Sequence, residues 1–474
     1  MAAEPLPGPL TGPLPGPLTA ACGAVRPAGP ADAVAGVLPR YVASPASVAE
    51  ASAVMAAAAG LGLAVLPRGT GTRLAWGGPP RRCDLVIDTL RLDRVLEHEA
   101  GDLVARVQAG VRIDKLAGVL GSAGQQLSLD LPEAPGGGGR GTVGGVLATG
   151  AAGPRRLRYG TPRDLSIGIT VVLADGTVAH SGGKVVKNVA GYDLGKLFAG
   201  SYGTLGLITE AAFRLHPVPA AAAFVTCDCG SAAAAQEVVA AAAGSPLAPS
   251  AVEIDRPARG RPVRASVLLE GDPAGVAERS ALLRELLRDL RRALRGEDRG
   301  SGGGGAGGGS GGRDVGGGSG EAGSGVSVSA GPPPWWGRSG VAAADATLIR
   351  IAFWAGELAA VLDALDAATA EAGLDPPAGG SAAAGILYAA IPAGAAPGAV
   401  AELVAALRAA RPLAAADGDG PPSRGSVVVV HAPPGVRDAV DVWGPVPSAG
   451  LMRAVKDQFD PGHRMAPGRL AGGI

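Results

Sequence analysis

The chain has 474 residues, 47% of them hydrophobic, and its 42 Lys and Arg side chains balance 42 Asp and Glu side chains. This length allows about two to four domains. The balanced charge argues against a protein that binds nucleic acid by neutralising phosphates, and against a polybasic membrane patch. The first residues lack the basic and apolar regions of a signal peptide, and no uninterrupted apolar run reaches the ~18–20 residues of a membrane span.

Cysteine and histidine spacing excludes the common metal sites. The four cysteines, Cys22, Cys83, Cys227 and Cys229, include no C-x-x-C pair, so neither a zinc ribbon nor an iron–sulfur cluster is expected within this chain. We expect reduced thiols in the core of a cytoplasmic protein. The five histidines include no ligand-spaced pair, and no metal site is predicted.

The first 36 residues are predicted to be a disordered, proline-rich tail. The phrase Gly-Pro-Leu-Thr occurs twice there, at Gly8–Thr11 and Gly16–Thr19. Proline at this density opposes both helix and sheet hydrogen bonding.

Residues 37–219 are predicted to form one α+β domain. Ser47 and Glu50 fit a capping box at the start of a helix that ends near Gly60. Asp175-Gly176 is typical of a two-residue hairpin turn. Strands dominate and helices are scattered between them, which favours α+β over a regular βαβ array. The predicted strands are Leu63–Leu66, Asp84–Asp88, Arg94–His98, Leu103–Gln108, Gln126–Leu129, Leu165–Ala174 and Thr177–His180.

Residues 220–445 are predicted to form a second α+β domain. Apolar strands are expected at Ala223–Cys227, Arg264–Leu269, Thr347–Phe353 and Ser426–His431, with an amphipathic helix at Val276–Leu294. Residues 296–331 are almost entirely Gly and Ser and are predicted to be a disordered insertion. Residues 446–474 are expected to pack back on the first domain.

Two glycine-rich loops point to an anionic ligand. Arg68-Gly-Thr-Gly-Thr72 directly follows a predicted strand, so its backbone can approach a phosphate closely. The loop at 136–145 contains a formal G-x-G-x-x-G, but prolines interrupt the segment before it, which argues against a Rossmann unit. Gly182-Gly-Lys184 is followed by Val185, so it lacks the hydroxyl that a P-loop needs for magnesium. Together the two loops suggest an extended ligand with a pyrophosphate.

An ordered set of motifs resembles the vanillyl-alcohol-oxidase/PCMH flavoprotein family. The set begins with Pro67–Thr72, Gly141–Gly150 and Arg158-Tyr-Gly160, and continues with Val171–Gly176, Gly182–Leu194 and Gly200–Glu210. The run at 187–193 most resembles the FAD-binding subunits of glycolate oxidase. The resemblance covers about residues 40–219 and, weakly, the C-terminal stretch at 460–469.

The resemblance implies a PCMH-type domain of two α+β subdomains that binds FAD, with an α+β cap domain over the flavin. It places the pyrophosphate near 68–72 and 142–145, the flavin along 148–160, and the adenosine half near Gly206 and Ile208. The positions that would bind FAD by covalent attachment carry neither His nor Cys, so non-covalent FAD is expected. The implied cofactor-binding residues are Pro67, Arg68, Gly69, Thr70, Gly71, Thr72, Gly141, Thr142, Val143, Gly144, Gly145, Ala148, Thr149, Gly150, Gly153, Tyr159, Gly160, Asp164, Gly206 and Ile208, with Asp164 as a buttress of the loops.

The resemblance further implies oxidation of a small 2-hydroxy acid, glycolate or D-lactate, by hydride transfer to flavin. A second flavin subunit and a separate iron–sulfur subunit would complete a cytoplasmic complex, which reaches a membrane only through its partners. Two alternatives stay open: a self-sufficient FAD oxidase of another alcohol or sugar, and a non-catalytic assembly subunit that has lost flavin. Ala466, where related proteins often carry Asn before Pro-Gly, favours the second alternative.

No acid–base pair for this reaction stands out in the sequence. Lys184 and Lys187 are candidates for stabilising negative charge on reduced flavin, because they lie in a glycine-flanked segment. His431 is a candidate base at the end of a cap strand. The structural interpretation is favoured for each of the three: a surface lysine pair for Lys184 and Lys187, and a core or strand-end histidine for His431.

Overall fold

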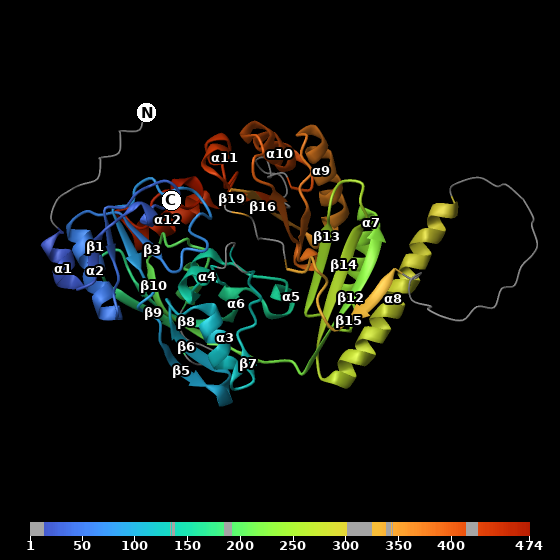
Figure 1. The fold of residues 1–474 in the computed structure, drawn as a ribbon, viewed down its shortest axis with the longest axis horizontal. Helices are drawn as coiled ribbons and strands as arrows, with labels where there is room; N and C mark the ends of the chain where they lie inside the picture. The colour runs from blue at the N-terminus through green and yellow to red at the C-terminus, as the bar shows by residue number, and fades with distance from the viewer. Residues whose placement is uncertain are drawn as a thin grey trace, which may run out of the picture.

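The chain folds into two lobes that lie side by side (Figure 1). The computed structural model describes residues 14–132, 134, 138–183, 192–300, 325–337, 343, 345–413 and 425–474. The first lobe runs from α1 (Gly16–Ala21) to β11 (His216–Pro217), and the second from β12 (Ala221–Gly230) to α11 (Pro434–Ala439). Helix α12 (Ala449–Phe459) returns to the first lobe (Figure 1). The predicted α+β class is confirmed.

The first subdomain of the first lobe is built on a four-stranded sheet. Its order is β1-β2-β4-β3, with β2, β4 and β3 parallel and β1 antiparallel. Helix α2 (Val48–Gly60) packs on it and begins as predicted: Ser47 Oγ accepts from the Glu50 amide at 3.1 Å. The strands are β1 (Val25–Pro27), β2 (Tyr41–Ala43), β3 (Val65–Arg68) and β4 (Leu85–Asp88).

The prediction of a disordered tail over residues 1–36 is wrong from residue 14 onward. Helix α1 accommodates its prolines because they lie at or before its first turn, where no backbone N–H bond is lost. Leu18 is fully buried against α2, and β1 pairs with β2. Asp32 forms ion pairs with Arg26 and with Arg68, and the second of these attaches the segment to the first subdomain. Burial of a few side chains therefore outweighs a disorder-prone composition.

The second subdomain is an antiparallel sheet with the order β5-β6-β10-β8-β9. Helices α3 (Ile113–Gly121) and α4 (Val143–Thr149) share its core, and α4 contacts both β6 and β10. The predicted hairpin turn at Asp175-Gly176 is confirmed, because it joins β8 to β9. The strands are β5 (Val95–Glu99), β6 (Val104–Gln108), β8 (Ser166–Val172), β9 (Val178–Gly182) and β10 (Leu207–Arg214).

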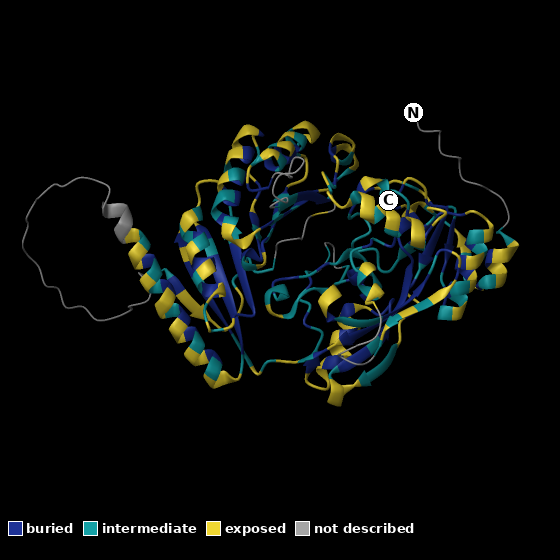
Figure 2. Ribbon diagram, turned by 180° about the vertical axis from the view of Figure 1, so that it is seen from behind, coloured by how far each residue is buried: buried dark blue, intermediate teal, exposed yellow. Residues whose placement is uncertain are grey.

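The second lobe, which we call the cap, is an eight-stranded antiparallel sheet with the order β15-β12-β14-β13-β17-β18-β16-β19. Helices cover one face over the largest hydrophobic core, and the other face is turned toward the first lobe (Figures 1 and 2). The elements not yet bounded are α7 (Ala232–Ala243), β13 (Ala251–Arg256), β14 (Val263–Gly271), α8 (Pro273–Gly300), β15 (Val326–Ser329), β16 (Thr347–Phe353), α9 (Leu358–Glu371), β17 (Ala378–Gly380), β18 (Ile386–Ile391), α10 (Pro397–Ala409) and β19 (Gly425–His431).

The predicted disordered insertion at 296–331 is too long at both ends. Helix α8 continues to Gly300, and β15 adds an edge strand beside β12 over Val326–Ser329. The short alternating Val-Ser-Val-Ser run buries Val326 and pairs its backbone, which the Gly-rich composition around it conceals. Residues 301–324 lie outside the described residues. None of the described helices combines the length and apolar character needed to cross a bilayer.

Candidate functional site

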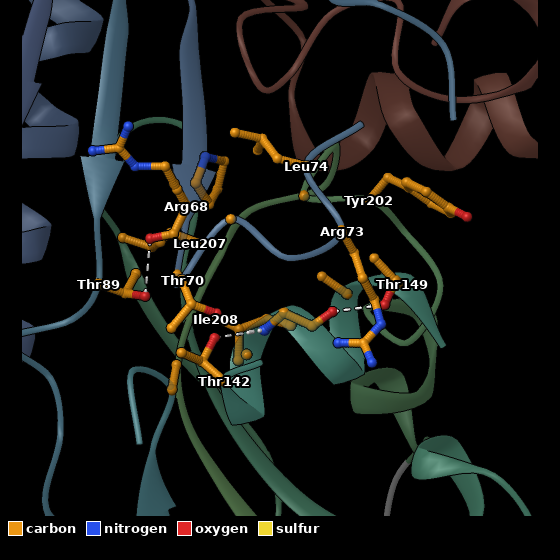
Figure 3. Close-up of a pocket in the computed structure, with 18 of the residues that line it drawn as sticks. Arg68, Thr70, Arg73, Leu74, Thr89, Thr142, Thr149, Tyr202, Leu207 and Ile208 are labelled. Carbon is orange, nitrogen blue, oxygen red and sulfur yellow. Dashed lines mark hydrogen bonds between the residues drawn. The ribbon is translucent and has the colours of Figure 1, made fainter. Parts of the chain in front are cut away.

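A cavity opens where the two subdomains of the first lobe meet (Figure 3). Its interior and its open mouth together hold about 710 Å³ of space not filled by protein atoms. Its walls are the loop after β3, the helix α4, the start of β10 and one residue near the C-terminus. The lining residues are Pro67, Arg68, Gly69, Thr70, Gly71, Thr72, Arg73, Leu74, Thr89, Ala109, Thr142, Gly144, Gly145, Ala148, Thr149, Tyr202, Gly203, Gly206, Leu207, Ile208 and Arg469.

The two glycine-rich loops meet at this cavity. A Cβ atom on Gly69 would collide with the hydroxyl of Thr142, so only glycine lets the chains approach so closely. Thr142 is the N-cap of α4, and its Oγ1 accepts from the Gly145 amide at 3.3 Å (Figure 3). Two segments about 70 residues apart in the chain thus form one continuous wall.

Unused hydrogen-bond donors in this wall belong to the first loop. Within the described part of the chain, the amides of residues 69–72 donate to no acceptor, and the buried Thr70 Oγ1 has no partner. The amides that begin α4 are all used: Val143 donates to Val111 O at 2.9 Å and Gly144 to Ala109 O at 2.8 Å. Buried polar groups normally have partners, so the Thr70 hydroxyl, with the free amides of this half-buried loop around it, suits a ligand rich in acceptor oxygens.

Arg73 brings a positive charge to the cavity without a carboxylate partner among the described residues. Its Nη1 donates to Arg140 O at 2.9 Å, and its guanidinium lies 5.5 Å from the ring centroid of Trp76. Burial lowers the pKa of Arg73 to about 10. The side chain therefore stays charged at neutral pH, and an anionic ligand would compensate it.

Arg469 brings a second such charge from the C-terminal segment. It is 4% exposed, its Nη1 donates to Gly78 O at 3.1 Å, and its buried Nε has no acceptor. Burial lowers the pKa of Arg469 to about 10. Arg68 differs, because Asp32 and Asp88 each lie 3.0 Å from it and its guanidinium points away from that of Arg73 (Figure 3).

Thirteen of the twenty predicted cofactor-binding residues line the cavity, a count taken from the lining set above. They comprise the whole of Pro67–Thr72, five residues of the α4 region, and both Gly206 and Ile208. Thr149 closes the α4 side, where its hydroxyl donates to Gly145 O at 2.7 Å (Figure 3). The structure therefore brings the three predicted groups together around one space.

Seven predicted residues do not line the cavity but support its walls. Val143 is buried in the core, and Gly141 adopts a φ of 95° beside Arg73. Gly150 ends α4 with a φ of 64°. A Cβ on Gly153 would collide with the Asp130 carbonyl, so glycine is needed there for packing.

The other three of these seven belong to α5 (Arg156–Tyr159), α6 (Pro162–Leu165) and the turn between them. Asp164 accepts from the Thr161 amide at 2.8 Å, and a Cβ on Gly160 would lie 2.6 Å from that of Asp164. The Tyr159 hydroxyl donates to Glu270 of the cap at 3.3 Å, so this ring faces the cap. Asp164 therefore lies against the turn at Gly160, and its role as a buttress of the loops stays a prediction.

The three weak catalytic candidates have different outcomes. Lys184 and Lys187 lie outside the described residues. His431 ends β19 opposite Leu348 and does not line the cavity. Ala466, which replaces the family's Asn, is fully buried in a small core cluster and does not line the cavity either.

Sequence reasoning missed several lining residues, of which three carry chemistry. Arg73 directly follows the predicted loop, so extending the loop by one residue would have found it. Tyr202 and Arg469 lie within stretches that carried the resemblance, but neither was selected. Tyr202 has a φ of 55° and its amide donates to Ala148 O at 2.8 Å, which fixes its ring at the cavity. The described residues include no group of three or more His, Cys, Asp or Glu side chains that would suit a metal ion.

Comparisons with known proteins agree with this geometry. An FAD binding domain family matches residues 39–182, which include both loops. The glycolate oxidase subunit GlcD of Bacillus subtilis is 38% identical over 183 residues, which are 38% of this chain and 38% of that protein. The D-lactate dehydrogenase of Archaeoglobus fulgidus is 39% identical over 176 residues, 37% of this chain and 38% of that protein. The matched stretch thus spans about two fifths of either relative.

A solved structure extends the likeness beyond the matched domain. The crystal structure of p-cresol methylhydroxylase with substrate bound has a TM-score of 0.65 and 16% sequence identity, and it covers 96% of this chain and 95% of that chain. At this identity the likeness shows the fold. Residues 39–182 therefore form an FAD binding domain, and the chain has the fold of p-cresol methylhydroxylase.

Proposed function

We propose that the chain is an FAD-dependent oxidoreductase that oxidises a small 2-hydroxy acid, glycolate or D-lactate. The observation that carries the proposal is the set of unused donors at residues 69–72, together with Arg73 and Arg469, around one cavity in an FAD binding domain. A pyrophosphate offers the acceptor oxygens and negative charge that these groups lack. The names of the two relatives point to 2-hydroxy acids as the substrate class.

The residues present fit FAD. Thr70 would donate its hydroxyl to the diphosphate, and the backbone of Gly69 and Gly71 would bring amides within reach of it. When bound, FAD supplies the two-electron oxidant for the alcohol carbon. No lining residue is His or Cys, so we propose non-covalent binding.

Arg73 and Arg469 would stabilise the negative charge that the cofactor gains on reduction. Arg469 is buried and Arg73 is half-buried at the cavity, so their charges act through a lower effective dielectric than that of water. This role was expected of Lys184 and Lys187; the two arginines have the buried position that the role requires.

We propose that the chain works as one subunit of a larger complex. The relative in Bacillus subtilis is named as a glycolate oxidase subunit. In this proposal a second flavin subunit and a separate iron–sulfur subunit accept the electrons. The complex lies in the cytoplasm, where the four buried cysteine thiols stay reduced, and approaches a membrane only through its partners.

The absorption spectrum of the purified chain, recorded without oxygen before and after glycolate or D-lactate is added, tests the proposal. We expect flavin bands that bleach with one of the two acids. A colourless chain that does not take up added FAD would refute it. Turnover of the acid with oxygen by the isolated monomer would support the self-sufficient oxidase instead of the subunit.

A further inference from the structure

A second group of unpaired cations lies on the cap, beside the FAD cavity. Arg350 of β16 pairs in register with Tyr388 of β18. Its neighbours Ile349 and Ile351 belong to the core under the cap helices. Because side chains alternate along a strand, Arg350 lies on the opposite face, which is turned toward the first lobe (Figure 1).

Arg350 has no hydrogen-bond acceptor and no ion-pair partner among the described residues, and its Nε is buried. A guanidinium carries five donors and stays charged at all physiological pH values. Leaving such a group half-buried without an acceptor is costly. An anionic ligand that enters this place removes the cost.

Two further donors have the same property. The Nη1 of Arg437 in α11 and the indole Nε1 of Trp443 are buried and have no acceptor. Burial lowers the pKa of Arg469, and the charge of Arg437 lowers it further; neither guanidinium forms an ion pair within the described residues. All of these unpaired groups are hydrogen-bond donors, so a ligand that binds them must offer acceptor oxygens.

The cap group borders the FAD cavity through Tyr202. The Tyr202 ring lines the cavity and meets Trp443 edge to face, with 5.2 Å between ring centroids. Burial raises the pKa of Tyr202, and the charges of Arg350 and Arg469 oppose that rise. The Gly77 amide also donates to Val430 O at 3.0 Å, which joins the end of β19 to the loop that carries Arg73.

The four cations divide into two pairs. Arg73 and Arg469 line the FAD cavity, whereas Arg350 and Arg437 do not. When FAD is bound, its diphosphate and its reduced ring would compensate the first pair. The second pair therefore requires another anion, one that lies between the cofactor and the cap.

We propose that Arg350, assisted by Arg437, binds the carboxylate of the acid that the enzyme oxidises, with the Tyr388 hydroxyl beside it. The inference rests on the proposed function and adds the residues that recognise its substrate. Trp76, Tyr388 and Trp443 pack over Leu348, Val428 and Val430 around this place, which favours a compact acid over a long one. A planar guanidinium matches a carboxylate with two parallel hydrogen bonds.

Binding of propionate, a carboxylate with no hydroxyl to oxidise, tests the proposal without turnover. The FAD-loaded full chain would be titrated with propionate, and binding would be followed by the change in flavin absorbance and by calorimetry. We expect Arg350→Met to raise the Kd about 10- to 100-fold, since a hydrogen bond to a charged group is lost. Arg350→Lys should raise the Kd less, because lysine keeps the positive charge but cannot form the two parallel hydrogen bonds of a guanidinium.

Arg261→Met is the matched control, because Arg261 is an exposed cap arginine in the turn between β13 and β14. It should leave the Kd and the flavin content unchanged. If Arg350→Met misfolds, Arg437→Met replaces it, with a Kd rise in the same direction expected. An unchanged Kd in a folded Arg350→Met or Arg437→Met variant would overturn the proposal.

The outcomes separate this inference from the proposed function. A chain that holds FAD but binds no propionate refutes the carboxylate site and leaves the FAD assignment standing. A chain that holds no FAD refutes the proposed function, and calorimetry with propionate then still decides the cap site.

Discussion

The two sides of the site are built in opposite ways. The FAD-domain side is made of backbone and small side chains from contiguous segments, Pro67–Thr72 and Thr142–Thr149. The cap side is made of long cationic and aromatic side chains, such as Arg350 and Tyr388, from separate strands. A wall made of backbone suits the cofactor, whose shape does not vary. Side chains can be substituted one at a time, so a wall made of them can change its ligand. The difference suggests that the substrate is selected on the cap.

The electrostatics follow the same division. Arg68, in the FAD-domain wall, is neutralised by Asp32 and Asp88. Arg350 and Arg437 lack such partners among the described residues. Arg68 therefore needs no ligand to balance its charge, whereas the two cap arginines do.

The largest expected effect comes from the variant Gly144→Val in the backbone wall. A Cβ there would lie 2.8 Å from the Ala109 Cβ and 3.2 Å from its carbonyl oxygen, and both residues line the cavity. We expect the variant to retain no FAD, because α4 must move into the space of the cofactor. Flavin absorbance per folded chain measures the outcome.

Gly118→Ala is the control for that loss, because Gly118 lies in α3 and a Cβ there meets nothing within 4 Å. It should retain full flavin. A folded Gly144→Val protein with full flavin content would contradict the position given to this wall.

The sequence predicted the FAD-domain side well, because the conformations of its loops and turns depend on residues that are close together in the chain. Glycine at 69 and 71, a threonine before α4 and a hairpin at 175–176 each leave a pattern within a few residues. Those patterns located the loops, α2 and the α+β class. The resemblance, and not these patterns, supplied Gly206 and Ile208, which line the same cavity.

The cap side could not be predicted, because its members come together only through the sheet register. Arg350 and Tyr388 are 38 positions apart and adjacent only after β16 and β18 pair. The prediction of a disordered N-terminal tail failed for a related reason. Leu18 orders α1 through its contact with α2, and composition does not reveal that contact. Long-range packing decided both cases.

The C-terminal segment joins the two sides, and Lys456→Met tests how firmly it is held. Lys456 and Asp460 are fully buried, with Nζ 2.6 Å from Oδ2, and Nζ also donates to Thr204 O and Met465 O. Removing the amine leaves Asp460 as a buried unpaired charge. We expect a loss of about 3–5 kcal/mol in the free energy of unfolding, measured with urea.

Lys115→Met is the matched control for a surface pair, because both Lys115 and its partner Asp93 are about half exposed. It should cost about 0–1 kcal/mol. Equal losses in the two variants would show that the C-terminal segment is not anchored by the buried pair.

The contact between the lobes gives a pH dependence. The Asp130 carboxylate accepts from the Arg155 amide at 3.0 Å, and the Arg155 guanidinium lies 3.0 Å from buried Glu270 of the cap. Burial raises the pKa of Asp130 to about 6, from 3.8. Because the folded state holds the proton more tightly, stability falls as pH rises between these two values, by on the order of 2–3 kcal/mol, and Asp130→Asn should remove this component. Urea unfolding across that range measures it, and an unchanged slope in the variant would contradict the assignment to Asp130.

The smallest expected effect, and the most specific, comes from Thr70→Val. The valine keeps the shape of the side chain and removes a buried hydroxyl that has no partner in the protein. The FAD-free chain should therefore lose no stability, while the Kd for FAD rises about 10-fold or more, because the hydroxyl's only acceptor belongs to the ligand. Fluorescence titration with FAD and urea unfolding measure the two quantities.

Thr142→Val should show the reverse order of effects. Its hydroxyl caps α4 through the Gly145 amide, so its loss should cost about 1 kcal/mol of stability even without FAD. The two threonines have the same chemistry and line the same cavity. If Thr70→Val destabilises the FAD-free chain as much as Thr142→Val does, its hydroxyl serves the fold, and the donors at 69–72 no longer argue for a ligand.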